Sequence, residues 1–235
     1  DGDVGPFDAS VVDAGEIPPF DWVGIIGTGQ SLSVGAQAKE VISTSQPFAN
    51  GKLVDIGPDP KYPRDGGSPI YVVSPLVEPI RPLLDSGASE YPTNIAGETP
   101  HSGMANEISA LFLGRSTVGY VSMHSVVGWS GHILAHIDKA GDPDGGFVGN
   151  AYPGSLAETR LFKSLADAAG KTYGVGAVVL THGESDCAIG NTNYQAGIQS
   201  LISSYNADLK AITGQTRDIV MLASQQSTCP GGFNS

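Results

Sequence analysis

Two short polar segments, each at the end of an apolar run, hold residue types that acyl-transfer chemistry needs. The first, GTGQSLSVG at 27–35, places Ser31 directly after the run DWVGIIG. The second, THGESD at 181–186, follows a valine-rich run and carries two carboxylates. A serine hydroxyl attacks a carbonyl carbon only when a base takes its proton and donors stabilise the oxyanion. Ser31 is therefore either such a nucleophile or the cap of a helix, a common role for serine.

Strands that end at a common edge must position these segments. Continuous rather than alternating apolar runs are typical of buried parallel strands, and there are four: 22–27, 118–127, 174–183 and 218–224. Apolar residues at helical spacing predict helices over 103–114, 155–170 and 193–214. This alternation predicts one α/β domain over residues 21–235, with a parallel sheet covered by helices on both faces. Residues 1–20 are expected to be an exposed N-terminal segment, and the Pro- and Gly-rich residues 36–100 a long loop region with short extended pieces.

The carboxyl ends of parallel strands are where ligands bind in open sheets. Ser31, the segment GWSGH at 128–132 and the segment 181–186 all occupy such positions. We therefore expect these three segments to meet at one edge of the sheet and to form the functional site.

The two polar segments together resemble a known family. GTGQSLSVG followed by VVLTHGESD is similar to the SGNH hydrolase superfamily, and more narrowly to its branch of sialate O-acetylesterases and acetylxylan-esterase-like enzymes. The resemblance spans Trp22 to about Ser224. It implies a three-layer α/β/α, flavodoxin-like fold and hydrolysis of O-acyl esters, chiefly O-acetyl esters, on carbohydrates. It implies no metal and no organic cofactor.

Carried over by position, the resemblance assigns catalytic roles to three residues. Ser31 is the nucleophile, and its own N–H is one oxyanion donor. Gly103, in HSGMANEIS, falls where the family places a glycine whose N–H is a second donor. His182 stands where the family has an Asn or Gln side-chain donor, and a neutral histidine can donate through a ring nitrogen.

Other positions match the surroundings of the family's site. Gln30 belongs to the Gly-Gln-Ser element, and Glu184 and Asp186 match its supporting acids. The loop from Gly128 to Gly131 is similar to the small-residue loop that lines the pocket. Ser130, in GWSGH, also resembles the nucleophile of a Gly-x-Ser-x-Gly elbow, but a histidine replaces the last glycine, so Ser130 is the less favoured nucleophile.

The general base is the main departure from the family, which takes it from an Asp-x-x-His element near the end of the domain. No Asp-x-x-His occurs in these 235 residues. We therefore expect this chain to be the N-terminal major part of a larger polypeptide, with a second polypeptide supplying the catalytic Asp and His. Of the internal histidines, His101 has nothing nearby in sequence to orient its ring. His132 and His136 have the i, i+4 spacing that can bind a metal, but no acidic third ligand lies beside them, so roles other than metal binding are favoured. The alternative is a non-catalytic carbohydrate-binding module that has the same fold without the base.

Composition excludes some classes of binding partner and indicates the cellular compartment. The formal net charge is −12, with only 12 Lys and Arg, which argues against nucleic acid and anionic membranes as main partners. An acidic start at Asp1 and the absence of Asn-x-Ser/Thr suit an exported bacterial protein, either secreted or periplasmic. Cys187 and Cys229 form one bridge in an oxidising compartment and are free in a reducing one.

Overall fold

The computed structural model describes residues 18–36, 38, 40–57, 70–80, 97–115, 119–141 and 151–224. The expected N-terminal segment, 1–20, lies outside these residues except for 18–20. In chain order the elements are β1 (Trp22–Gly29), the helical turn η1 (Ser31–Val34), β2 (Gly51–Asp55), β3 (Tyr71–Pro75), α1 (Pro100–Leu113), β4 (Ser122–Gly128), α2 (Leu134–Ile137), α3 (Ala151–Ala168), β5 (Tyr173–Thr181), α4 (Glu184–Ala188), α5 (Tyr194–Thr213) and β6 (Val220–Ala223).

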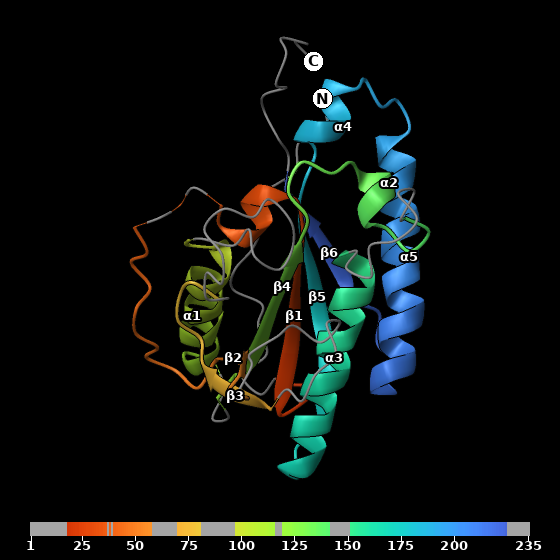
Figure 1. Ribbon diagram of the computed structural model, residues 1–235. Coiled ribbons are helices and arrows are strands. Elements are labelled where there is room, and N and C mark those ends of the chain that lie inside the picture. The colour runs from red at the N-terminus through yellow and green to blue at the C-terminus, as the bar shows by residue number, and fades with distance from the viewer. Residues whose placement is uncertain are drawn as a thin grey trace.

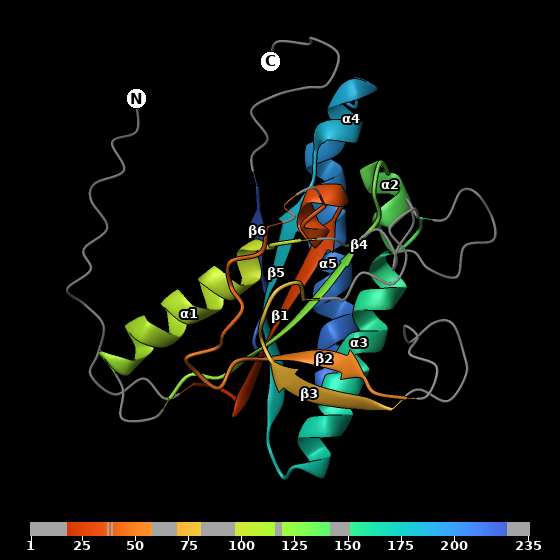
Figure 2. The same cartoon turned by 60° about the vertical axis from the view of Figure 1, so that its left-hand side comes forward.

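The described strands form one six-stranded sheet in the order β3-β2-β4-β1-β5-β6. The four strands predicted from apolar runs are β1, β4, β5 and β6, and all of them run parallel. The prediction of an entirely parallel sheet is wrong at one edge, because β3 pairs antiparallel with β2 (Figure 2). Both of these strands lie in the region 36–100, which was expected to be a long loop region with short extended pieces. They are short and only half-buried, so their periodic signal is weak.

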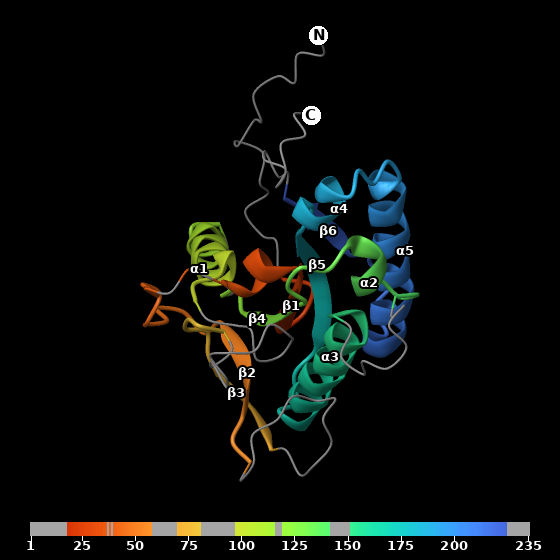
Figure 3. The same ribbon diagram turned by 45° about the horizontal axis from the view of Figure 1, so that its top comes forward.

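Helices lie on both faces of the sheet, with α1 on one face and α3 and α5 on the other (Figures 1 and 3). The α5 face matches its prediction, since Leu201, Tyr205 and Leu209 are buried. They pack in one core with Phe162 of α3 and the strand residue Ile26. Burying each such side chain contributes roughly 1.5–3 kcal/mol. None of the described helices is long and apolar enough to span a bilayer.

Helix α1 packs against the sheet through small and polar residues rather than through most of its apolar ones. Leu111, one of its apolar residues, is 50% exposed. The buried residues of α1 are small or polar, among them His101 and Ser109. Asn50 accounts for the burial of this polar face of α1. Its side chain donates to Ser109 Oγ and accepts from the backbone N–H of Ser122 in β4. These hydrogen bonds satisfy the polar groups that α1 buries against β4.

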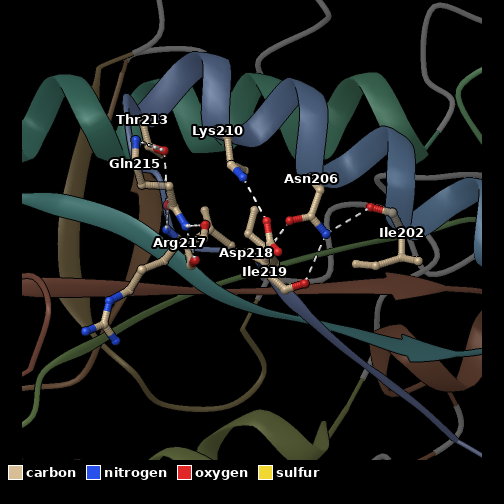
Figure 4. Close-up of polar contacts among 9 residues, drawn as sticks. Ile202, Asn206, Lys210, Thr213, Gln215, Arg217, Asp218 and Ile219 are labelled. Carbon is tan, nitrogen blue, oxygen red and sulfur yellow. Dashed lines mark hydrogen bonds and ion pairs between the residues drawn. The ribbon is translucent and has the colours of Figure 1, made fainter.

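Two amide side chains fix the passage from α5 into β6 (Figure 4). Gln215 accepts a hydrogen bond from Val175 N–H and donates one to the Val175 carbonyl, at 2.7 and 2.9 Å. Asn206 does the same for Ile219, accepting from its N–H at 2.8 Å and donating to its carbonyl at 3.1 Å. Each side chain pairs with both polar groups of one residue, as a neighbouring strand would.

Candidate active site

Three strands end together at the carboxyl edge of the sheet. Gly29 of β1 is in register with Gly128 of β4 and with Thr181 of β5. Gly29 has φ +136°, and a Cβ atom there would lie 2.0 Å from the Thr181 carbonyl oxygen. Only glycine fits this backbone, which lets the chain leave β1 in a sharp turn.

The turn after β1 presents Ser31 as the first residue of η1. The carbonyl of Gln30 accepts hydrogen bonds from both Ser33 N–H and Ser33 Oγ, at 3.0 and 2.6 Å. The Ser31 carbonyl in turn accepts from Ala36 N–H at 3.0 Å. These bonds occupy the polar groups around Ser31 and leave its half-buried side chain at the surface of the turn.

A pocket of 430 Å³ opens over this turn. Its lining residues come from the ends of three strands: Gln30, Ser31, Leu32, Ala36, Gly131, Glu184, Ser185 and Ala188. The pocket therefore brings together three of the candidate residues, Ser31, Gln30 and Glu184, and also contains Ser185, which was not singled out in the sequence.

The side chain of Gln30 connects the two predicted segments. Its Nε2 donates a short hydrogen bond to the Glu184 carboxylate, and its Oε1 accepts one from Ser185 Oγ at 2.9 Å. Gln30 is buried, so these bonds replace the water that its amide would otherwise bind. They hold the η1 turn against the start of α4.

Asp186 and His182 lie behind the pocket wall rather than in its lining. Asp186 is buried and accepts a hydrogen bond from Leu134 N–H at 2.7 Å, which ties α4 to α2. His182 Nε2 donates to the His132 carbonyl at 2.9 Å, and Nδ1 lies 3.1 Å from the Tyr194 hydroxyl. Burial lowers the pKa of His182, which favours the neutral ring, so Tyr194 donates to Nδ1. Both ring nitrogens are therefore used by the protein.

The other predicted site residues take different positions. Gly128 is packed tightly, since a Cβ atom there would lie 2.2 Å from Ser33 Oγ. Ser130 is half-buried in the loop after β4, and its carbonyl accepts a hydrogen bond from His132 Nδ1 at 2.8 Å. Gly103 is the fourth residue of α1 and is exposed. Neither Ser130 nor Gly103 lines the pocket.

All five histidines lie within the described residues, and none of them hydrogen-bonds to Ser31 Oγ. His101 and His124 are buried and bond to each other through their Nδ1 atoms at 2.9 Å. The His132 ring stacks on Trp129. Across the described part of the chain, no three His, Cys, Asp or Glu side chains are grouped as metal ligands.

Sequence analysis missed Glu78, a buried carboxylate near the start of α1. It accepts hydrogen bonds from Thr99 Oγ1 at 2.6 Å, from Ser102 Oγ at 2.9 Å and from Ile80 N–H at 2.8 Å. Burial raises its pKa. Glu78 thus anchors the N-terminus of α1, and the only sequence signal for it is an acid amid apolar residues and prolines.

Cys187, in α4, is disulfide-bonded. The other cysteine of the chain, Cys229, lies outside the described residues.

Comparisons with known proteins describe the fold more than the site. The sequence matches no protein-family model, and a search of curated proteins finds no match. A solved structure of a protein from Arabidopsis thaliana is similar over 87% of this chain and 86% of that one, with 13% identity and a TM-score of 0.53. NanS is similar over 88% of this chain and 68% of its own, with 11% identity and a TM-score of 0.49. At this identity the likeness to the Arabidopsis protein shows a common α/β fold alone.

Proposed function

We propose that this chain is the major part of a serine esterase of the SGNH type, which removes O-acyl groups, chiefly acetyl, from carbohydrate hydroxyls. One observation carries the proposal: Ser31 lies in a pocket at the carboxyl edge of a parallel sheet, beside Gln30 and Glu184. The residues that resemble the family's two motifs are thus in contact although they are far apart in the chain. The α/β fold is compatible with the same conclusion.

The proposed reaction has two steps. Ser31 Oγ attacks the ester carbonyl carbon and gives its proton to a histidine, and the sugar alkoxide leaves with that proton. Water then hydrolyses the acyl-serine by the reverse proton path. The histidine and its orienting aspartate come from polypeptide outside residues 1–235.

The oxyanion that forms in each step needs hydrogen-bond donors. We assign the Ser31 N–H to this role, with the Gly103 N–H and the His182 ring as the further donors that the resemblance implies. For His182 to donate to substrate, its bond to the His132 carbonyl or to Tyr194 would have to break. Of these three donors, the Ser31 N–H therefore has the strongest geometric support.

The compartment we propose is extracytoplasmic. A disulfide-bonded Cys187 supports it, because such bonds persist mainly in oxidising compartments. The acylated carbohydrate would bind in the pocket against Ser31 and Leu32, which both line it.

Active-site labelling tests the esterase proposal. The protein, purified with every polypeptide that accompanies it, is treated with a fluorophosphonate probe and assayed with 4-nitrophenyl acetate and acetylated xylan. We expect Ser31→Ala to abolish labelling and to lower hydrolysis at least about a thousandfold. The matched control is Ser130→Ala, which should keep both. Labelling that survives Ser31→Ala would show that another residue is the nucleophile.

A non-catalytic binding module is the second candidate, favoured by the fact that no histidine bonds to Ser31 Oγ. It predicts no labelling of the assembled protein, together with calorimetric binding of acetylated xylo-oligosaccharides. Because Leu32 is exposed at the pocket, Leu32→Asp should then weaken binding, and an acidic substitution far from the pocket should not.

A further inference from the structure

Two carboxylates lie at the pocket, and no cation neutralises either of them. Glu184 lines the pocket and is bonded to the carboxamide of Gln30. Asp186 lies behind the pocket wall and accepts hydrogen bonds from Leu134 N–H and from the Asn191 side chain. These donors are uncharged amides, and within the described residues neither carboxylate pairs with a lysine or an arginine. The charge of both groups therefore acts on the pocket.

His182 does not neutralise these carboxylates either. Its Nδ1 lies 3.7 Å from the Asp186 carboxylate, but burial lowers the pKa of His182, so the ring is neutral at pH 7. The two acids also act on a neighbouring hydroxyl. Burial raises the pKa of Tyr194, and the charges of Asp186 and Glu184 raise it further. The electric field of the acids thus reaches groups packed around the pocket.

The basic residues that the structure describes lie elsewhere, and none of them lines the pocket. Lys171 and Arg217 come just before β5 and β6, so they lie at the amino edge of the sheet, opposite the pocket. Strand β5 spans 9 residues, so this edge is about 26 Å away, about three Debye lengths at physiological ionic strength. Lys139, Lys163 and Lys210 pair with aspartates of their own.

The pocket is small enough for its charge to act on any substrate inside it. A sphere of 430 Å³ is about 9 Å across, close to the Debye length of about 8 Å at physiological ionic strength. Two like charges about 9 Å apart weaken binding about twofold in bulk water, and about twentyfold at a dielectric constant of about 20, typical near a protein surface. Leu32, which lines the pocket and is 47% exposed, offers an uncharged substrate apolar contact without this repulsion.

We propose that Glu184 makes this site selective for acyl esters of uncharged carbohydrates, and that a carboxylate on the sugar ring lowers kcat/KM. The selection rests on the esterase proposal, because it concerns the substrate of the same pocket. Glu184 then has two roles: its carboxylate oxygen positions Gln30, and its charge disfavours acidic sugars. A glutamine at this position could accept the same hydrogen bond but would carry no charge.

A pair of substrates that differ only in charge tests the selection. Methyl 3-O-acetyl-β-D-glucuronoside carries a carboxylate, and its uronamide carries a carboxamide of nearly the same shape. Acetate release is measured with the protein purified together with every polypeptide that accompanies it. At an ionic strength of about 10 mM, where the Debye length is about 30 Å, we expect kcat/KM for the uronamide to exceed that for the acid about fivefold. At about 1 M, where the Debye length is about 3 Å, the ratio should fall toward one.

Glu184→Gln assigns the effect to one charge. The variant keeps an acceptor for Gln30 Nε2, and we expect the ratio of the two kcat/KM values to fall at least about threefold, whatever the absolute rates. The matched control is Glu107→Gln, which removes an exposed charge from α1 outside the pocket and should leave the ratio unchanged. Equal kcat/KM values with the unmodified protein would overturn the proposal, as would a ratio that Glu184→Gln does not alter.

The two proposals fail separately. If Ser31 is labelled and both substrates are hydrolysed with equal kcat/KM, the esterase proposal stands and the selection fails. If no ester is hydrolysed, the esterase proposal fails, and calorimetric Kd values of the same pair decide the selection. Binding of the uronamide about fivefold more tightly than the acid supports it, whereas equal or undetectable binding of both overturns it.

Discussion

Gln30 and Glu184, 154 positions apart in the chain, are joined by a hydrogen bond from the Gln30 amide to the Glu184 carboxylate. Ser185 adds a second bond to the same amide. The bonds join the turn that carries Ser31 to the helix that follows β5. The position of Ser31 therefore depends on a side chain from the other motif.

Replacing Gln30 by leucine should displace Ser31. The change removes two hydrogen bonds and leaves the Glu184 carboxylate without its amide donor, so we expect a loss of about 1–3 kcal/mol in the free energy of unfolding. A shift of Ser31 by about 1 Å would lower kcat about a hundredfold. Urea unfolding and ester hydrolysis measure the two effects. The control is Gln195→Ala, an exposed change on α5, and equal activity of the two variants would contradict the prediction.

Gly29→Ala should prevent the sharp exit from β1. Its Cβ would lie 2.0 Å from the Thr181 carbonyl oxygen, at a φ of +136°. We expect a loss of about 3 kcal/mol or more in the free energy of unfolding. Gly114→Ala, at φ −70° and with its nearest contact at 3.5 Å, should change it little. Similar midpoints for the two variants in thermal unfolding would show that the β1 turn is less constrained.

The variant His182→Gln distinguishes two roles for His182: holding the neighbouring loop and helix in position, or donating a hydrogen bond to the oxyanion. Because His182 holds the His132 carbonyl and Tyr194, we expect the melting temperature and kcat to fall together. Tyr194→Phe removes one of these contacts without touching the pocket and should cause a smaller loss of the same kind, about 1 kcal/mol in stability. A large fall in kcat at unchanged melting temperature would instead identify His182 as an oxyanion donor.

Acidification should destabilise the fold through the buried histidine pair. Burial lowers the pKa of His101 to about 4, and burial beside His101 lowers the pKa of His124 well below its ordinary value of 6.5. Below pH 6.5 both histidines bind protons in the unfolded chain, but in the folded chain they stay neutral. The free energy of unfolding is therefore highest above pH 6.5 and decreases as the pH falls toward 4. Between pH 6.5 and 5 the loss from His101 is about 2 kcal/mol, and His124 adds a loss of the same sign.

Urea unfolding at pH 7.5, 6.5, 5.5 and 5.0 measures this slope. His124→Gln removes one of the two protonations and should reduce it by about half. His132→Gln, a change at a half-exposed position, serves as the control. If His124→Gln and the unmodified chain have equal slopes, the buried pair is not the cause.

Long apolar runs made most of the sheet predictable. The strands around Ile26 and Val178 are continuous in sequence, and α5 buries the stripe that its spacing indicates. The face through which α1 packs was not predictable from apolar spacing, because Ser109 is held by Asn50, a residue far away in the chain. Periodicity records only the spacing of apolar residues, so it does not identify a helix face that is buried through polar hydrogen bonds.

The candidate site was predictable in its residues more than in its geometry. Two motifs indicated that Ser31 and Glu184 lie near each other, because parallel strands end at one edge. The inward position of His182 could not be foreseen, since it depends on Tyr194 from α5 and on a carbonyl in the loop after β4. Glu78 was missed because it lies 21 positions before Thr99, so no local spacing relates it to the start of α1.

Gln215 makes one corner of the sheet depend on the identity of a single residue. A true strand would pair with Val175 whatever its sequence, because every peptide unit carries the same donor and acceptor. Here one carboxamide performs that task, so the pairing of Val175 is lost with any side chain at position 215 that cannot both donate and accept. Even glutamate, which has nearly the same shape, would bring two acceptors to face the Val175 carbonyl.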